Sequence, residues 1–160
     1  MKRIMKAWNC SYPSYDGHDV FYAPNASKAR YLAYCRWADG GGFTLHRIRA
    51  NRNEAADIHL PDEHRLVAEL SDSDRHIILH AYGYDSHVDP KKWGYRDHYC
   101  TAPSDGRLLR LAWELGLFRG PFGATGYGET PGWVGAFFYL TELGQLVARS
   151  IIPAYGGREA

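Results

Sequence analysis

The amino-acid sequence predicts an α+β protein with two parts, a small β-β-α-β module over residues 1–70 and a second module over residues 71–153. Two observations support this class. Apolar and polar residues alternate in short runs near the N-terminus, as in strands with one buried face, whereas later apolar residues recur at helical spacing. Because 45% of the 160 residues are hydrophobic and 23% are charged, the composition excludes general disorder.

Turn and capping residues separate the expected elements of the first module. Asp16-Gly17 marks the turn of a β-hairpin, and Asn25 or Ser27 can cap the helix that follows. Asp39–Gly42 ends that helix, and the alternation of the last strand slips once at His46-Arg47. The expected elements are strands at Met5–Cys10 and Asp19–Ala23, a helix at Ala26–Ala38 and a strand at Phe43–Arg49.

Helices predominate in the second module, and their ends carry recognisable signals. Ser71–Asp74 is a run of capping residues, Thr141 caps the last helix, and Gly83 and Gly116 follow helix ends. The expected elements are helices at Arg75–Tyr82, Gly106–Leu115 and Glu142–Ile152, a short strand or turn at Tyr95–Thr101, a glycine-rich ribbon at residues 120–135 and an apolar segment at Ala136–Leu140. Residues 154–160 are expected to form a flexible tail.

Three linked segments of the second module follow one another in a familiar order. The helix Arg107–Leu117 precedes the ribbon at residues 118–140, which ends in Leu140-Thr141-Glu142-Leu143-Gly144. This order resembles a winged helix, in which such a helix precedes the wing and an LTxxG signature ends it. The resemblance implies binding to DNA through the major groove, or contact with a protein. The residues that would carry this binding are Arg107, Arg110, Arg119, Tyr127 and Trp133.

Several short motifs are spread along the whole chain: Ser27-Lys28-Ala29-Arg30, Arg47-Ile48-Arg49, His80-Ala81-x-Gly83, Tyr95-Arg96-Asp97-His98-Tyr99, Leu115-Gly116-Leu117 and Thr141-x-x-Gly144. In these motifs the chain is similar to small accessory proteins of bacteriophages and prophages. The resemblance implies a non-catalytic binding protein of the bacterial cytoplasm, acting on DNA or on a host or phage protein, with inhibition of host defence as one such role. The sequence leaves the oligomeric state open, with a homodimer as one alternative.

Basic residues concentrate between residues 28 and 52, although the net charge of the chain is only +1. Six Lys and Arg stand there against one acid, Asp39, which gives a local charge of +5. A cluster of this kind is typical of phosphate binding, and the alternative is a solvated face whose long side chains cover the sheet. The six residues are Lys28, Arg30, Arg36, Arg47, Arg49 and Arg52.

Histidines concentrate between residues 59 and 98, which holds six of the eight. His76 and His80 are four residues apart and share a face of a helix, and His98 and Cys100 share a face of a strand. These four could together bind zinc, which makes a metal-dependent enzyme the alternative function. The other interpretation is structural, because the Glu of a metalloprotease motif is missing between His76 and His80.

Other motifs of catalysis and targeting are missing from the sequence. No Gly-x-Ser-x-Gly occurs, and the glycines of residues 120–135 lack the Lys-Ser/Thr of a phosphate-binding loop. We therefore expect a protein without catalytic activity or cofactor. The longest uncharged apolar stretch, Gly132–Leu140, is about half a membrane span, so we expect no membrane contact. Cys10, Cys35 and Cys100 are widely spaced, as in a reduced cytoplasmic protein.

Overall fold

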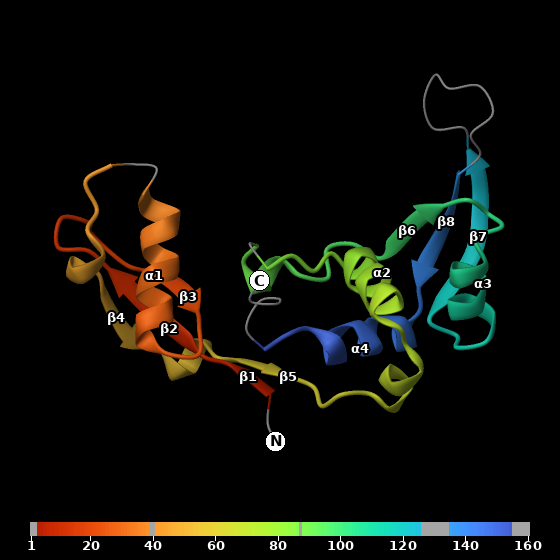
Figure 1. Cartoon of the computed structure of the whole chain (residues 1–160), viewed down its shortest axis with the longest axis horizontal. Helices are drawn as coiled ribbons and strands as arrows, with labels where there is room; N and C mark the ends of the chain where they lie inside the picture. The colour runs from red at the N-terminus through yellow and green to blue at the C-terminus, as the bar shows by residue number, and fades with distance from the viewer. Residues whose placement is uncertain (1–2, 39–40, 87, 126–134, 155–160) are drawn as a thin grey trace. The chain divides into compact units, whose positions relative to one another are not determined.

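The computed structural model describes residues 3–38, 41–86, 88–125 and 135–154, and it confirms the α+β class (Figure 1). The chain divides into two compact units. The first unit is formed by residues 3–61 with residues 153 and 154, and the second unit by residues 62–152. The boundary thus follows Pro61 rather than residue 70, because Val67 and Leu70 are buried in the hydrophobic core of the second unit.

In its described residues, the first unit contains one α-helix, two short 3-10 turns at Leu45–Arg47 and Glu54–Ala56, and two small sheets. Its elements are β1 (Arg3–Met5), β2 (Ala7–Ser11), β3 (Asp19–Tyr22), α1 (Ala26–Trp37), β4 (Arg49–Arg52) and β5 (Ile58–Leu60). The main sheet has the order β3-β2-β4, in which both outer strands are antiparallel to β2, and β1 pairs with β5. The predicted hairpin and helix are confirmed, and Asn25 is the residue that caps α1, accepting a hydrogen bond from the Lys28 amide.

Two predicted strands of the first unit are placed differently. The strand predicted at Met5–Cys10 is interrupted at Lys6, so that β1 and β2 belong to different sheets. The strand predicted at Phe43–Arg49 begins only at Arg49, because residues 45–47 form a short 3-10 turn. That turn buries Ile48 in the core and leaves Leu45 43% exposed, which accounts for the slip in the alternation.

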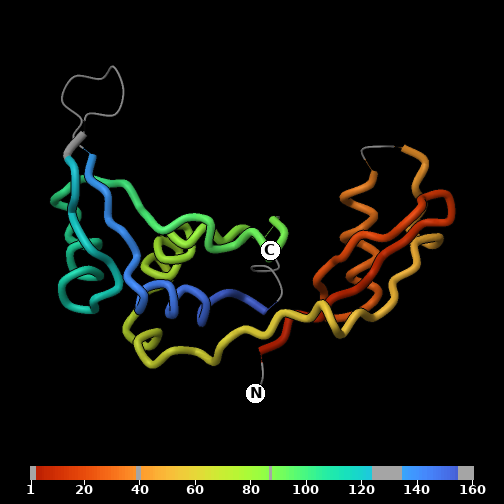
Figure 2. Tube along the Cα trace, turned by 180° about the vertical axis from the view of Figure 1, so that it is seen from behind, coloured from red at the N-terminus to blue at the C-terminus, as the bar shows by residue number. Residues whose placement is uncertain are grey.

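Helix α1 packs on one face of the main sheet, as the views from the two sides show (Figures 1 and 2). The small side chains of Ala29 and Ala33 are fully buried, so the helix backbone lies close to Cys10 and Phe21 of the strands. Because side chains alternate along a strand, the other face of β3-β2-β4 is not covered by this helix.

The second unit places three helices against one sheet. Its elements are α2 (Asp72–Tyr82), β6 (His98–Thr101), α3 (Gly106–Trp113), β7 (Phe118–Thr125), β8 (Gly135–Leu140) and α4 (Glu142–Ile151), with short 3-10 turns at Arg65–Glu69 and Pro90–Lys92. The sheet has the order β6-β8-β7 and is antiparallel throughout. The three predicted helices are confirmed, although α2 begins three residues earlier than expected because Ser71 and Asp74 form a reciprocal capping box.

The core of the second unit lies between the helices and one face of this sheet. Phe138 of β8 is fully buried, and the side chains around it come from all three helices, among them Ile78, Leu111 and Val147. The strand β8 has a clear alternation, in which Ala136, Phe138 and Leu140 face this core. The intervening residues of β8 therefore face the opposite side of the sheet.

The segment Leu140–Gly144 connects β8 to α4 and packs on the end of α3. The Thr141 hydroxyl accepts a hydrogen bond from the Gly144 amide at 3.0 Å and donates one to the Gly116 carbonyl at 2.7 Å. The Thr141 amide donates to the Leu117 carbonyl at 3.0 Å. Gly144 lies against the same carbonyl, and a Cβ there would overlap its oxygen. These contacts explain why threonine and glycine occupy this motif.

The order of elements after residue 71 is helix, strand, helix, strand, strand, helix. Residues 102–105 run directly from β6 to α3 without a further helix, so α3 is not preceded by the first helix of a helix-turn-helix pair. Of the helices in the described ranges, none is both long enough and apolar enough to cross a membrane.

Candidate nucleic-acid interface

The six basic residues predicted as one cluster lie on different sides of the first unit. Lys28, Arg30 and Arg36 are on α1, where Lys28 lies over the Tyr31 ring at 5.4 Å. Arg49 is on β4, and its pairing partner Ser11 places it on the sheet face away from α1. The predicted cluster is thus not a single surface.

Arg52, which the sequence also placed in the cluster, is used within the fold. Its guanidinium donates two hydrogen bonds to the Asp57 carboxylate, at 2.7 Å and 2.5 Å, and a third to the Ala7 carbonyl at 3.0 Å. It also lies over the Trp8 ring at 5.7 Å. The hydrogen bond from Arg52 holds the pKa of Asp57 below its ordinary value, so the pair stays ionised. Arg52 is therefore a poor candidate for phosphate contact.

Arg47 lies in the 3-10 turn, where its guanidinium stacks over the Tyr12 ring at 5.4 Å. The Tyr12 hydroxyl shares a hydrogen bond of 3.2 Å with the Thr44 hydroxyl, which is the main cause of the lowered pKa of Tyr12. Arg47 remains exposed while its stem packs on an aromatic ring. It is available for a charged partner beside the sheet.

The face of β3-β2-β4 opposite α1 carries polar side chains in register. Asn9 of β2 pairs with Val20 on one side and with Asn51 on the other, and Ser11 pairs with Arg49. Arg49 and Asn51 are exposed. The carboxamide of Asn9 accepts a hydrogen bond of 2.8 Å from Asn53, which fixes its orientation. We call these five residues the open face; they are Asn9, Ser11, Val20, Arg49 and Asn51.

The open face belongs to the basic part of the chain. Residues 1–61 contain nine Lys and Arg against five Asp and Glu, a net charge of +4, whereas residues 62–152 contain nine against twelve, a net charge of −3. The near-neutral total therefore combines two units of opposite sign. A unit of net charge +4 attracts polyanions through its overall field, whereas binding of a polyanion to the acidic second unit would depend on local contacts.

Comparisons with protein families, curated proteins and solved structures find no match to this chain. The assignment of a function therefore depends on the geometry of the chain's own residues.

The arginines predicted on the recognition helix hold the second unit together. The Arg107 guanidinium donates to the Ser73 hydroxyl at 2.7 Å, and that of Arg110 donates to the Glu69 carbonyl at 2.9 Å. Both guanidiniums also face the buried Asp74 carboxylate, at 4.0 Å and 3.4 Å. They bind α3 to the start of α2, so the structure assigns them a positioning role. Arg119 is exposed on β7, whereas Tyr127 and Trp133 lie outside the described residues.

The four residues predicted to bind zinc are on opposite sides of a strand. His80 of α2 packs edge to face with Tyr99, on the side of β6 that faces the core, with ring centroids 5.5 Å apart. His98 and Cys100 alternate with Tyr99 and therefore point to the other side. In the described part of the chain, no group of three potential metal ligands forms. Burial is the main reason that the pKa of His80 is lowered, with the nearby charges of Arg96, His76 and His98 adding to it.

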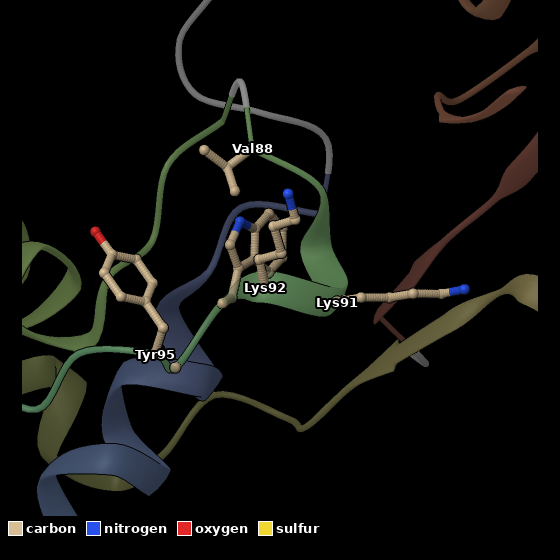
Figure 3. Close-up of a pocket in the computed structure, with 6 residues that line it drawn as sticks. Val88, Lys91, Lys92 and Tyr95 are labelled. Atoms are coloured by element: carbon tan, nitrogen blue, oxygen red, sulfur yellow. The ribbon is translucent and has the colours of Figure 1, made fainter.

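The described residues also line two hollows on the surface. One of about 480 Å³ is lined by Ser27, Arg30, Leu45 and His46 of the first unit. The other, of about 640 Å³, lies in the loop between α2 and β6 and is lined by Val88, Lys91, Lys92, Trp93, Gly94 and Tyr95. Figure 3 shows Lys91 and Lys92 extending in different directions and Tyr95 pointing away from both. In the smaller hollow, the Arg30 guanidinium donates a hydrogen bond to the Ser27 hydroxyl at 3.3 Å.

Three polar residues of the open face, Asn9, Ser11 and Asn51, are not indicated by charge along the chain. The sequence pattern that could have indicated them is the alternation along β2 and β4, where polar residues two positions apart share one face of the strand. That two such runs form one surface depends on the pairing of β2 with β4, which are separated by the hairpin and the helix.

Proposed function

We propose that this chain is a non-catalytic nucleic-acid-binding protein whose first unit docks on duplex DNA through the open face of β3-β2-β4. The observation that carries the proposal is that four of the five residues of this face are polar, two of them (Arg49 and Asn51) exposed, in a unit of net charge +4. Strands lie about 4.8 Å apart, so three strands span roughly 10 Å, which suits a major groove about 12 Å wide.

The side chains of the open face have the chemistry of base readers. Asn pairs with the edge of adenine and Arg with the edge of guanine, each through two hydrogen bonds. Asn51 and Arg49 stand two positions apart on β4, so both point to the same side. Asn9 lies in the neighbouring strand directly opposite Asn51. Helix α1 backs the sheet, as in proteins that read a groove with strands.

Binding of a labelled duplex, followed by fluorescence anisotropy at several salt concentrations, tests the proposal. We expect the double variant R49A/N51A to lower affinity about tenfold or more, because each good bidentate contact contributes about 1–3 kcal/mol. The matched control is K28A/R36A, which removes two positive charges from the helix side. Because its effect is limited to long-range attraction, we expect a loss of about threefold or less.

Equal losses in the two double variants would show that charge alone drives binding and would contradict the role of the open face. The proposal would also be contradicted if the wild-type protein bound no duplex at 50 mM salt. Far-UV circular dichroism of both variants checks that the fold is retained.

A second proposal is DNA binding by residues 71–153 as a winged-helix-like module. The observation that favours it is the antiparallel β7-β8 pair after α3, closed by the Thr141 and Gly144 contacts. Arg119 is an exposed basic residue on β7 of this pair, whereas Arg107 and Arg110 contact Asp74. R119A tested in the same duplex assay separates the two proposals. If residues 71–153 bind the duplex, R119A lowers its affinity and R49A/N51A does not.

A further inference from the structure

The second unit has a sheet face that the first proposal does not use and that the second proposal uses only through Arg119. The register of β6-β8-β7 places its outward side chains in two rows across the strands. The first row is His98, Tyr139 and Arg119, and the second row is Cys100, Phe137 and Phe122. We call these six residues the aromatic face.

The four rings of the aromatic face form one continuous surface. The His98 ring centroid lies 5.5 Å from that of Phe137 and 5.9 Å from that of Tyr139. The Tyr139 ring centroid lies 6.2 Å from that of Phe137 and 6.0 Å from that of Phe122, and Phe122 is 51% exposed. All four therefore lie within the distance at which rings contact one another.

The position of these rings is unusual because the core lies on the other side of the same sheet. Phe138, between Phe137 and Tyr139, is fully buried, and Ala136 and Leu140 are almost so. In an antiparallel sheet with one covered face, the uncovered positions are commonly polar. Here the central strand carries two aromatic residues at those positions, and both remain partly exposed.

The charge of the aromatic face is positive although the second unit is acidic. The described strands β6, β7 and β8 contain one cation, Arg119, and no Asp or Glu. Asp97 stands just before β6, and its carboxylate lies 3.2 Å from Nδ1 of His98. Arg119, at the end of the row that contains Tyr139, can therefore pair with an anionic group of a ligand whose flat ring lies on Tyr139.

We propose that the aromatic face binds single-stranded nucleic acid by stacking unpaired bases on Phe137, Tyr139 and Phe122, with Arg119 contacting a phosphate. Aromatic side chains on an open antiparallel sheet stack two or three bases in this way, and the stacking tolerates any sequence because every base has a flat face. Bases within a duplex are already stacked on one another, so this surface selects unpaired strands. The site is separate from the open face of the first unit and does not depend on it.

The test is anisotropy of a labelled 12-nucleotide single strand, with an unlabelled duplex of the same sequence as competitor. We expect F137A and F122A each to weaken binding about tenfold, as removal of one stacked base does. R119A should lower affinity and reduce the slope of log affinity against log salt by about 0.7, the contribution of one phosphate contact to a single strand. The matched control is Y95A, which removes an exposed ring elsewhere in the second unit.

Two further variants separate stacking from packing. F137W keeps a flat ring and should retain binding, whereas F137L keeps apolar volume and should lose it about tenfold. Equal affinities of F137L, F137A and the wild type would overturn the proposal, as would a single strand that does not bind. The variant R49A/N51A should bind the single strand unchanged, so failure of this site and failure of the open face give different results.

Discussion

Replacement of Gly144 by alanine tests the contact that joins α4 to the strand before it. A methyl group there would overlap the Leu117 carbonyl oxygen and lie 2.9 Å from a methyl carbon of Leu140. The same carbonyl accepts the amide of Thr141 at 3.0 Å. Because the obstacle is backbone rather than a flexible side chain, the start of α4 and the start of β7 must separate.

The cost can be worked out from these contacts. Overpacking of a well-filled site costs about 3 kcal/mol at the upper end of its usual range, and the strained hydrogen bond of Thr141 adds about 1 kcal/mol. The higher helix propensity of alanine returns about 1 kcal/mol. We therefore expect G144A to lower the free energy of unfolding by about 3 kcal/mol. With a urea dependence of about 2 kcal/mol per molar, the midpoint falls by about 1.5 M.

Urea unfolding followed by far-UV circular dichroism measures this loss, and G106A is the matched control. Gly106 begins α3, and a Cβ there meets no atom within 4 Å. We expect G106A to change the free energy of unfolding by less than about 0.5 kcal/mol. If G144A were as stable as G106A, the close packing of α4 on the Leu117 carbonyl would be refuted.

Two more predictions follow from buried groups. The side chain of Asp74 is only 5% exposed; its carboxylate accepts a hydrogen bond from the Ser71 hydroxyl and faces the guanidiniums of Arg107 and Arg110. We therefore expect D74A to lower the free energy of unfolding by about 2–3 kcal/mol in the same urea assay. An unchanged midpoint would contradict this pairing. Burial raises the pKa of the Cys10 thiol from 9.0 to about 11, which lowers its thiolate fraction at pH 8 about 100-fold. In native protein a thiol reagent should thus label exposed Cys35 and spare Cys10, and equal labelling rates would contradict the prediction.

The helices were predicted well because their signals are local. The caps of α1, α2 and α3 are side chains within three residues of the amides that they bind, so capping chemistry indicates these helix starts to within about three residues. The sequence also predicted the capping role of Thr141. Each of these features depends on residues that are neighbours in the chain.

The candidate site was predicted only in part, because charge along the chain does not determine charge on a surface. Arg49 and Arg52 are three residues apart, yet one is exposed on the open face and the other is paired with Asp57. Arg107 and Arg110 are basic residues of a helix, yet both contact Asp74. A partner elsewhere in the chain decides whether a cation is available.

The sequence by itself determined the α+β class, the helices and their caps, and the strong concentration of basic residues before residue 53. Only the tertiary structure decided where the first unit ends, how β2 pairs with β4, and which side of each sheet the helices leave uncovered. The physical reason is that propensity and capping act over a few residues, whereas strand pairing and burial join segments far apart in the chain. Both proposed binding faces are products of that pairing.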